Sequence, residues 1–589
     1  MGGLIVVLLL VGAVRTFTLV LWRPICGYGD NSDMIRVMAV FDLWPTDGGR
    51  GVVHWASPAR RYAFGRFGPE CSVYSSQILL MAPAVAAMRV VNHFAPATAF
   101  DVRCLGFSQA LILTILACGY CLRFWRTGHR RAAWLNAVVF AVLLADPMNT
   151  LFFNGFFTET ASLIFGYFAV LAGVDLCLAG PAPLPSVVFA LSVFCLGTSK
   201  QQHLPTALLL GPAFAAAVWY YRGRLTRTLT VSTAAAMFLA IAFVSWNFSR
   251  HDGLAIAMVR GSTTNTILGG VLPLTRDRER AVQLLGLPHE YVAYVGKTWC
   301  DQAMSTRIAG VKIFDVPRAR LLWLFWDDPS LLWRLVQRGM HELEGGRQGT
   351  FAKEGMVLTY LGYSEGHAYD RIPFPSLCQW FCRLGYPAYR LLFLLPLALL
   401  PLCAGRAIWL RGSQTPGIEL PVLVLGPIAY ACFMVTILGD GYWEFAKHNH
   451  LTFNLLLALL LLFLIDLGAG LARLAFRRWG QRSLSPSQDA AVVADRAPGA
   501  KKRISGGLVA GLTFALFVVL SSGLVVGLAE PPALPSWNPA QVAHQSRPCG
   551  AVEEGSWLPG GNLRLAGWAC NPRTGKSIRA IILVRQGRV

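Results

Sequence analysis

The sequence predicts an all-α polytopic membrane protein, and three observations support this fold class. Of its 589 residues, 54% are hydrophobic and only 14% are charged, and the mean hydropathy is +0.49. A soluble chain of this length would carry far more charge on its surface. Many apolar runs approach the roughly 20 residues that cross a bilayer as a helix. Finally, the basic residues lie in short clusters between these runs, as in cytoplasmic membrane loops.

We expect about eleven transmembrane helices together with interfacial helices. The expected spans are residues 3–22, 105–122, 132–147, 159–178, 186–199, 204–220, 229–248, 388–404, 420–438, 450–468 and 507–527. They divide the chain into an N-terminal membrane module (1–248), an extracytoplasmic loop region (249–387), the C-terminal membrane helices (388–527) and a small β domain (528–589).

The arginine clusters fix the expected orientation of these helices. With the spans above, four clusters fall on one side of the membrane: residues 123–131, 222–227, 406–411 and 473–503. The positive-inside rule makes that side cytoplasmic, so the N-terminus lies inside and the C-terminus outside.

One further helix, expected over residues 77–95, is not counted as a crossing. It carries Pro83, Arg89 and His93, which favour an interfacial helix lying along the membrane. A crossing at this point would move the arginine cluster 123–131 to the outside and break the charge pattern.

Composition excludes some classes of partner and site. The net charge of +21 comes from the membrane-loop clusters, so we expect membrane lipids rather than nucleic acid as partners. The fourteen cysteines show no CxxC pair and no zinc spacing. Two outer pairings, Cys26 with Cys71 and Cys549 with Cys570, remain open as disulfides. The first apolar run has no small-residue cleavage site and is expected to remain as an anchor.

The outer side collects nearly every carboxylate and amide cluster, whereas the cytoplasmic loops hold mostly arginine. The outer segments with polar clusters are residues 22–76, 146–159, 200–203, 249–387 and 440–450. Chance would scatter such clusters over both faces. This asymmetry indicates that the chemistry of the protein lies on the extracytoplasmic side.

The first cluster, GDNSDMIRV, contains Asp30 and Asp33 just after the first span. A carboxylate at this position can deprotonate an acceptor hydroxyl. The alternative is structural, because Asp30 or Ser32 can cap a short helix with Asp33 in its first turn.

Glu159 follows the aromatic loop LFFNGFFT, at the point where the chain re-enters the membrane as an apolar helix. A carboxylate at the boundary of a span is costly, so either function or an interaction with the helix N-terminus must compensate.

The hairpin SKQQH places Lys200, Gln201, Gln202 and His203 between two apolar spans. This compact set of donors suits phosphate oxygens. A lone lysine that snorkels to the interface would explain Lys200 but not its three polar neighbours.

The last cluster, GDGYWEFAKHNH, contains Glu444, Lys447 and His448 at the start of the tenth span. Lysine and histidine there again suit phosphate binding, although a solvated outer loop is the alternative.

Two other segments indicate smaller elements. Residues 320–337 have a leucine and aromatic face broken by Asp327, Asp328 and Pro329, which is typical of two amphipathic helices on a membrane surface. The tail after the Pro-rich linker EPPALPSWNP alternates apolar and polar residues around a turn region, which predicts a small β unit outside the membrane.

These motifs resemble those of the GT-C superfamily, the membrane glycosyltransferases that use polyprenyl-phosphate-linked sugars. The runs GDNSDMIRVMAVFDLWP and FFNGFFTE are similar to the two motifs of a bacterial branch, the glycan-biosynthesis hexosyltransferase-like proteins. Asp33 and Arg36 match the first motif, and Asn154 and Glu159 match the second. The chain departs from these motifs at Met34-Ile35 and at Gly155, which leaves the carboxylates in place. The resemblance extends to about residue 470.

The resemblance implies a GT-C-like fold in a bacterial inner membrane, with the active site periplasmic. It implies Asp33 as general base on an acceptor hydroxyl of a glycan, lipid or protein, and Glu159 as the residue that orients the acceptor or a cation. Arg36 and Lys200, with Lys447 or His448, would hold the phosphate of the departing lipid. Some members use a divalent cation, Mg²⁺ or Mn²⁺, and others do not, so the metal is unknown.

Three other classes remain as alternatives. An O-antigen polymerase or ligase would use basic residues of the large outer loop: Arg276, Arg278, Arg280 and His289. A lipid-linked glycan transporter would need polar or broken helices in the middle of the membrane, whereas polarity here gathers at one face. A scaffold would bind outer partners through the β tail.

Overall fold

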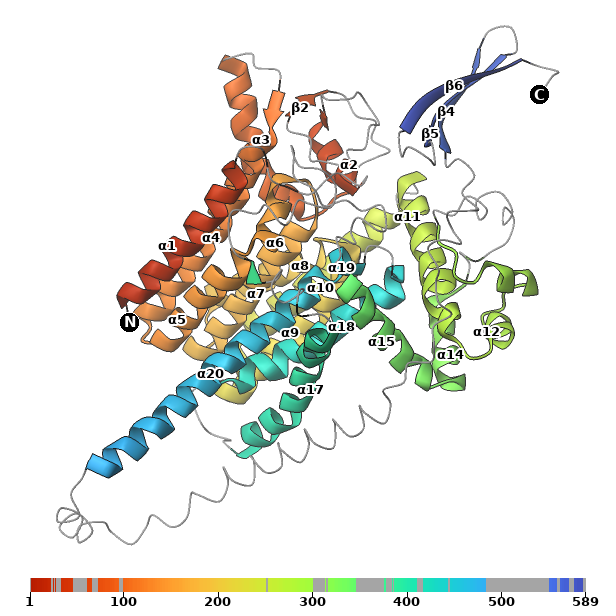
Figure 1. Cartoon of the computed structure of the whole chain (residues 1–589). Coiled ribbons are helices and arrows are strands. Elements are labelled where there is room, and N and C mark those ends of the chain that lie inside the picture. Colours follow the sequence, from red (N-terminus) through yellow and green to blue (C-terminus); the bar gives the residue numbers. More distant parts are fainter. Residues whose placement is uncertain are drawn as a thin grey trace. The chain divides into compact units, whose positions relative to one another are not determined.

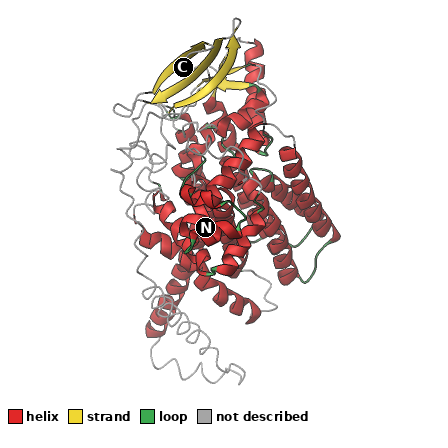
Figure 2. Cartoon of the chain, turned by 90° about the vertical axis from the view of Figure 1, so that its right-hand side faces the viewer, coloured by secondary structure: helices red, strands yellow, loops and turns green. Residues whose placement is uncertain are grey.

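The computed structural model describes a largely helical chain (Figures 1 and 2). The described residues are 2–22, 25, 27, 33–45, 61–65, 73–94, 99–249, 253–299, 313, 316–345, 376–377, 384, 386–409, 417–442, 445–483, 550–558, 562–570 and 577–585. The chain forms two compact units, residues 1–501 and 502–589, and each is described by itself.

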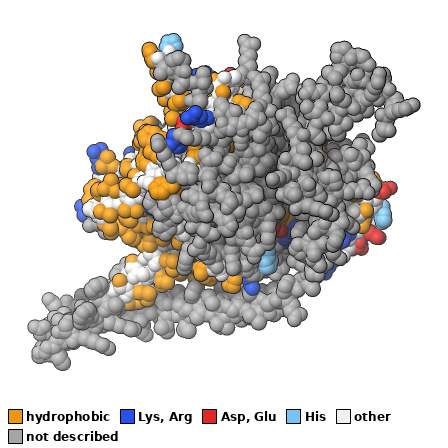
Figure 3. Space-filling model, turned by 45° about the horizontal axis from the view of Figure 1, so that its top comes forward, with side chains coloured by type: hydrophobic (Ala, Val, Ile, Leu, Met, Phe, Trp, Pro, Cys, Tyr) orange, Lys and Arg blue, Asp and Glu red, His pale blue; other side chains and the backbone are white. Residues whose placement is uncertain are grey.

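The first unit is a bundle of apolar helices. Its long members are α1 (Gly2–Leu21), α3 (Gln77–Phe94), α4 (Val102–Arg126), α7 (Glu159–Ala179), α9 (Leu204–Arg222), α10 (Arg227–Ser249), α17 (Tyr386–Trp409), α18 (Glu419–Asp440) and α20 (His450–Ser483). Hydrophobic side chains cover much of the described surface visible in Figure 3. On α1, for example, Leu10 and Val14 are exposed, as expected of a helix that faces lipid.

Within the described ranges, nine helices are long and apolar enough to cross a membrane, or ten with one bent pair. One of the nine is α3, which was not expected to cross, and the other eight correspond to expected spans. The run 186–199 forms α8 (Pro183–Gly197), whose 15 residues fall short of the roughly 20 that span a bilayer. The run 132–147 forms the bent pair, with an angle of 69° between residues Arg130–Leu144 and Pro147–Asn154. The run 507–527 lies outside the described residues.

One end of the bundle carries the arginine loops, and we call it the arginine end. It holds the C-terminus of α4, where the Arg123 side chain donates to Asp175 at the far end of α7. Tyr220 near the end of α9 donates to the carbonyl of Ala407 near the end of α17, and Arg406 pairs with Glu419 at the start of α18. The clusters around residues 123, 222 and 406 therefore share one end, as the sequence predicts.

The opposite end carries the predicted polar segments, and we call it the polar end. Ser75 and Ser76, just before α3, donate to the carbonyls of Ser199 and Cys195 at the end of α8. Gln202, after α8, donates to the carbonyl of His448 between α18 and α20. Segments far apart in the chain therefore meet at this end.

Helix α3 begins at the polar end and extends away from the bundle (Figure 1). Ser76, just before its first residue, contacts α8, while Met88 lies beside Cys104 in the first turn of α4. Although α3 meets the length and hydropathy criteria for a span, both of its neighbours in the chain remain at the polar end. Its placement preserves the alternation of the arginine and polar ends.

Smaller elements cover the polar end. The helix α2 (Asp33–Met38) precedes an antiparallel sheet of β1 (Leu43–Pro45), β2 (Arg61–Phe64) and β3 (Ala99–Asp101), with Trp44 opposite Ala63. The region between α10 and α17 adds α11 (Gly253–Thr264), α12 (Arg278–Leu284), α14 (Leu321–Asp327) and α15 (Ser330–Gly345).

The second unit contains three antiparallel strands in the order β4 (Gly550–Leu558), β5 (Asn562–Cys570) and β6 (Ser577–Arg585). The register pairs Trp568 with Ala551 and Arg579, and a bulge falls between Val552 and Glu554. The two disulfides that the sequence leaves open involve cysteines whose side chains are not among those that the structure describes.

Candidate functional site

A buried ion pair joins two of the predicted site residues at the polar end. Glu159 is the first residue of α7, and Lys200 begins the turn that follows α8. The Nζ of Lys200 lies 2.8 Å from Oε1 of Glu159, with side-chain exposures of 18% and 2%. The position of Glu159 in the first turn of α7 also sets its negative charge near the positive end of the helix dipole. We call this interaction the Glu159–Lys200 pair.

The hairpin that carries Lys200 is folded tightly by its own backbone. The amide of His203 donates to the carbonyl of Lys200 at 2.8 Å, which closes the short 3₁₀ turn Gln201–His203. The ring of His203 is buried and lies close enough to Glu159 and Lys200 for electrostatic interaction with both. Gln201, in contrast, is exposed to the outside of the bundle.

The segment before α20 brings further polar groups to the same end. Lys447, in α19 (Phe445–His448), is 1% exposed, and its Nζ lies 5.3 Å from the ring centroid of Phe157. Phe157 is two residues before Glu159, so the Lys447 side chain packs against the loop that leads to the Glu159–Lys200 pair. The carbonyl of His448 accepts a hydrogen bond from the Gln202 side-chain amide at 2.9 Å, which ties α19 to the lysine hairpin.

His448 also meets a carboxylate at the end of α18. Its Nδ1 lies 3.3 Å from Oδ2 of Asp440. The other oxygen of Asp440 accepts from Asn265, in the π-helical segment Asn265–Val271. Gly441 follows at φ +65°, and a Cβ on it would lie 2.4 Å from the Asn265 carbonyl oxygen, so this close turn requires glycine.

Helix α2 packs against the loop that leads into Glu159. Met34 belongs to a buried cluster with Phe152, Phe156 and Phe157, and a Cβ on Gly155 would lie 2.8 Å from the Met34 Cε. The backbone of Asp33, the first residue of α2, therefore lies beside this aromatic loop. The side chain of Asp33 and the whole of Asp30 and Glu444 lie outside the described residues. Arg36, in the same helix, is half-buried.

Asn154 has a different placement from the one expected of a substrate-binding residue. It is buried, and its Nδ2 donates to the carbonyl of Val20 in α1 at 3.0 Å. Its Oδ1 faces α4 so closely that a Cβ on Gly106 would lie 2.0 Å away. The Asn154 amide therefore holds the aromatic loop to α1 and α4.

Sequence reasoning missed a second polar network beside the pair. His450 and Asn149 are joined by a 2.6 Å hydrogen bond between Nε2 and Oδ1, and Asn454 donates to the same Asn149 oxygen at 2.9 Å. The spacing of His450 and Asn454 is one helical turn, which is the only sequence signal for this network. Gln77, at the start of α3, is also fully buried, and its side-chain amide has no hydrogen-bond partner among the described residues.

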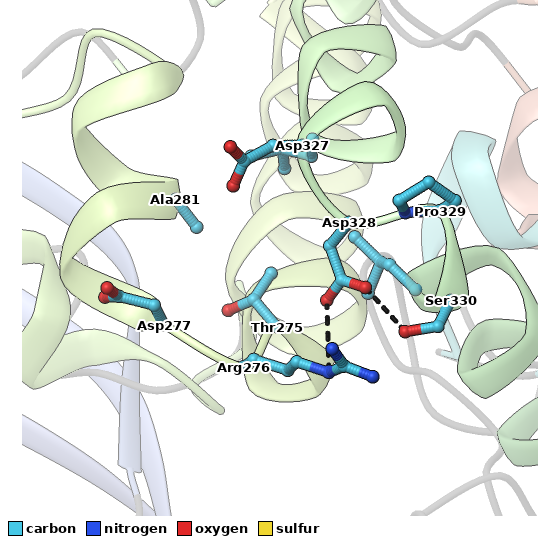
Figure 4. A pocket seen from close by; sticks show the side chains of 10 residues that line it. Thr275, Arg276, Asp277, Ala281, Asp327, Asp328, Pro329 and Ser330 are labelled. Carbon is cyan, nitrogen blue, oxygen red and sulfur yellow. Dashed lines mark hydrogen bonds and ion pairs between the residues drawn. The ribbon is translucent and has the colours of Figure 1, made fainter.

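A separate cavity of about 380 Å³ lies in the region between α10 and α17 (Figure 4). Its lining includes Arg276, Asp277, Asp327 and Asp328, and it shares no residue with the Glu159–Lys200 pair. Burial alone would raise the pKa of Asp328, but hydrogen bonds from Ser330 and Arg334 and the charge of Arg334 lower it overall.

Three basic residues of this region lie beside carboxylates. Arg280 pairs with Asp327, and Arg276 lies 4.0 Å from Asp328. His289 lies 3.8 Å from Glu279. These are three of the four residues that the polymerase or ligase alternative would use, and Arg278 is the fourth.

The family comparison covers the first half of this architecture. Residues 3–341 match the family model described as the YfdI N-terminal transmembrane domain. The chain belongs to this family. The match includes α1 to α14 and most of α15, and hence both the Glu159–Lys200 pair and the cavity, whereas Lys447 and His448 lie beyond it. No curated protein and no solved structure matches the chain.

The described residues do not supply a set of ligands for a divalent cation. No group of three or more His, Cys, Asp or Glu side chains gathers within them. The Glu159 carboxylate, which the resemblance would offer to a cation, is already paired with Lys200. We therefore assign no chemical step to Mg²⁺ or Mn²⁺.

Proposed function

We propose that this protein is a membrane glycosyltransferase that moves a sugar from a polyprenyl-phosphate donor to an extracytoplasmic glycan, lipid or protein acceptor. The observation that carries the proposal is the buried Glu159–Lys200 pair, with Lys447 and His448 gathered at the same end of the bundle. The arginine loops lie at the opposite end, and the positive-inside rule supports an extracytoplasmic polar end. The bacterial inner membrane is part of the proposal.

The proposed reaction is a single displacement at the anomeric carbon of the sugar. Asp33 accepts the proton of the acceptor hydroxyl as the hydroxyl oxygen attacks that carbon. The bond from the carbon to the phosphate oxygen breaks, and the electron pair leaves with the polyprenyl phosphate. The phosphate therefore gains negative charge in the transition state, and a cation beside it lowers the barrier.

Lys200 and Lys447 suit the role of holding this phosphate. Both ammonium groups are largely removed from water, and charge interactions are stronger in such surroundings than in solvent. Glu159 holds Lys200 in place before the donor binds. It also keeps a carboxylate near the acceptor side of the proposed site, beside the aromatic loop.

The direct experiment is a transfer assay with the purified protein in proteoliposomes and a panel of polyprenyl-phosphate sugars. We expect at least one donor to lose its sugar to an added acceptor, and the Lys200→Met variant to lose this transfer while it remains inserted. Full transfer by an inserted Lys200→Met variant would contradict the proposal.

The cavity favours one second candidate, a polymerase or ligase that binds its glycan in the outer loop region. Arg276 contributes to the lining of that cavity. An Arg276→Gln variant that loses activity beside an Asp33→Asn variant that keeps it would select this candidate over the first.

A further inference from the structure

We propose that α14 and the start of α15 form a membrane-inserted anchor, with the tryptophans of α14 seated in the lipid headgroup region at the polar end. The proposal concerns the outer surface of these helices and does not depend on the sugar-transfer function. Its occupant is the bilayer itself, not a second protein.

The two faces of α14 differ sharply. Leu321 and Leu324 are buried in the core cluster that also holds Leu331 and Leu335 of α15. The opposite face presents Leu322, Trp323 and Trp326, with exposures of 67%, 63% and 84%. The first turn of α15 adds exposed Leu332 and Trp333.

The position of this face along the bundle identifies its occupant. Arg318, three residues before α14, donates to the carbonyl of Gly439, and Tyr442 donates to the carbonyl of Leu335 in α15 at 2.7 Å. Gly439 and Tyr442 flank the last residue of the α18 span. The α14–α15 hairpin is therefore fixed at the level where a membrane-spanning helix ends.

Further contacts hold the hairpin at this level. The guanidinium of Arg338 in α15 lies 4.3 Å from the ring centroid of Tyr442 and also donates to the carbonyl of Gly269 at 3.2 Å. The hairpin therefore cannot move away from the end of α18 without breaking several interactions.

The residue types of the α14–α15 hairpin agree with a position at the membrane interface. Tryptophan gathers at the membrane interface because its ring is apolar while its indole N–H reaches headgroups or water. Arg318 and Arg320 precede the apolar face and donate to backbone carbonyls of Gly439 and Leu285. Both residues are exposed and a carbonyl partner takes no proton from them, so two positive charges precede the apolar face, as anionic headgroups would favour.

The proposed anchor also contributes residues to the lining of the cavity. Leu324, Asp327 and Asp328 line it from the same hairpin. Seating the tryptophans in the bilayer would hold this polar cavity against the membrane surface, within reach of the head of a lipid-linked molecule.

The test uses the full-length protein in lipid nanodiscs with a bimane label on Trp326→Cys, and the parent protein treated in the same way corrects for native cysteines. Lipids brominated at the upper part of the acyl chain quench bimane only on contact. We expect the label on Trp326→Cys, and on a second variant, Leu322→Cys, to be clearly less fluorescent in brominated lipid than in the same lipid without bromine. The matched control is His289→Cys, because His289 is 76% exposed but lies in a polar setting, and its label should keep its fluorescence.

Unquenched labels at both 322 and 326 would overturn the proposal, since either a second copy of the chain or a soluble partner on this face would exclude lipid. Equal quenching at 289 would overturn it as well, because the contact would then not be specific to the tryptophan face.

Discussion

Helix α7 carries one ion pair at each end, and the two pairs have different surroundings. At the arginine end, Asp175 is 4% exposed and its partner Arg123 is 43% exposed. At the polar end, Glu159 and Lys200 are both largely buried, and His203 lies beside them. The same helix therefore holds a pair whose cation reaches water and a pair that is enclosed.

Under the proposed function, this difference distinguishes a contact that joins two helices from one that binds substrate. A half-exposed arginine at the end of a span can interact with headgroups and water while it joins two helices. An enclosed pair is weak evidence for stability, because desolvation of both charges offsets most of their attraction. Lys447 and His448 lie at the same end as this pair. We therefore expect the pair to take part in binding a charged group, the phosphate of the proposed donor.

The largest expected effect is on catalysis at the polar end. We expect Asp33→Asn to lower transfer by about 10²–10⁴-fold, because removal of a general base has a cost of this size. The matched change at the arginine end, Asp175→Asn, should leave transfer per inserted molecule near the wild-type value. Near-normal turnover by Asp33→Asn in the proteoliposome assay would assign the base to another residue.

The next effect is on stability. We expect Lys200→Met to lower the free energy of unfolding by about 3–5 kcal/mol, because it leaves the Glu159 carboxylate buried without a partner. Arg131→Met removes the partner of Asp466 from a more exposed pair at the arginine end. That change should cost at most about 1 kcal/mol.

Thermal unfolding in one detergent, followed by the fluorescence of a thiol-reactive dye, compares the two variants. Equal shifts of the unfolding midpoint would show that enclosure makes no difference to these pairs.

A smaller effect concerns the glycines of α4. Gly106→Ala should destabilise the protein by about 1–3 kcal/mol, because the added methyl would meet the Asn154 amide and displace it. Gly119 lies on the same helix toward the arginine end with open space around its Cβ position, so Gly119→Ala should be neutral or slightly stabilising. A tolerated Gly106→Ala would mean that the aromatic loop is not tightly held against α4. The same unfolding assay measures both.

Much of this arrangement could be predicted from sequence, because hydropathy and charge act along the chain. The apolar runs predicted the long helices, and the arginine clusters predicted which helix ends lie together. Glu159 and Lys200 were each predicted to be site residues, and the fold brings them to 2.8 Å although 41 positions separate them.

The remainder depends on tertiary contacts that have no sequence pattern. The bend after Leu144 follows a π segment at Phe140–Leu144, and hydropathy is insensitive to such backbone changes. Asn154 was expected to bind substrate, and that stays a prediction. Its Nδ2 donates to the carbonyl of Val20, 134 positions away, a contact that no local motif reveals. The network of His450, Asn149 and Asn454 was missed for the same reason.

The central claim is that the Glu159–Lys200 pair is kept for function and not for stability. The most direct test replaces both partners at once, with Glu159→Gln and Lys200→Met in one chain, beside a control chain with Asp175→Asn and Arg123→Met. Removing both charges leaves no buried unpaired ion, so both double variants should unfold close to the wild-type temperature. We predict that sugar transfer is lost in the first double variant and retained in the second. Retained transfer in the first, or equal loss in both, would contradict the account.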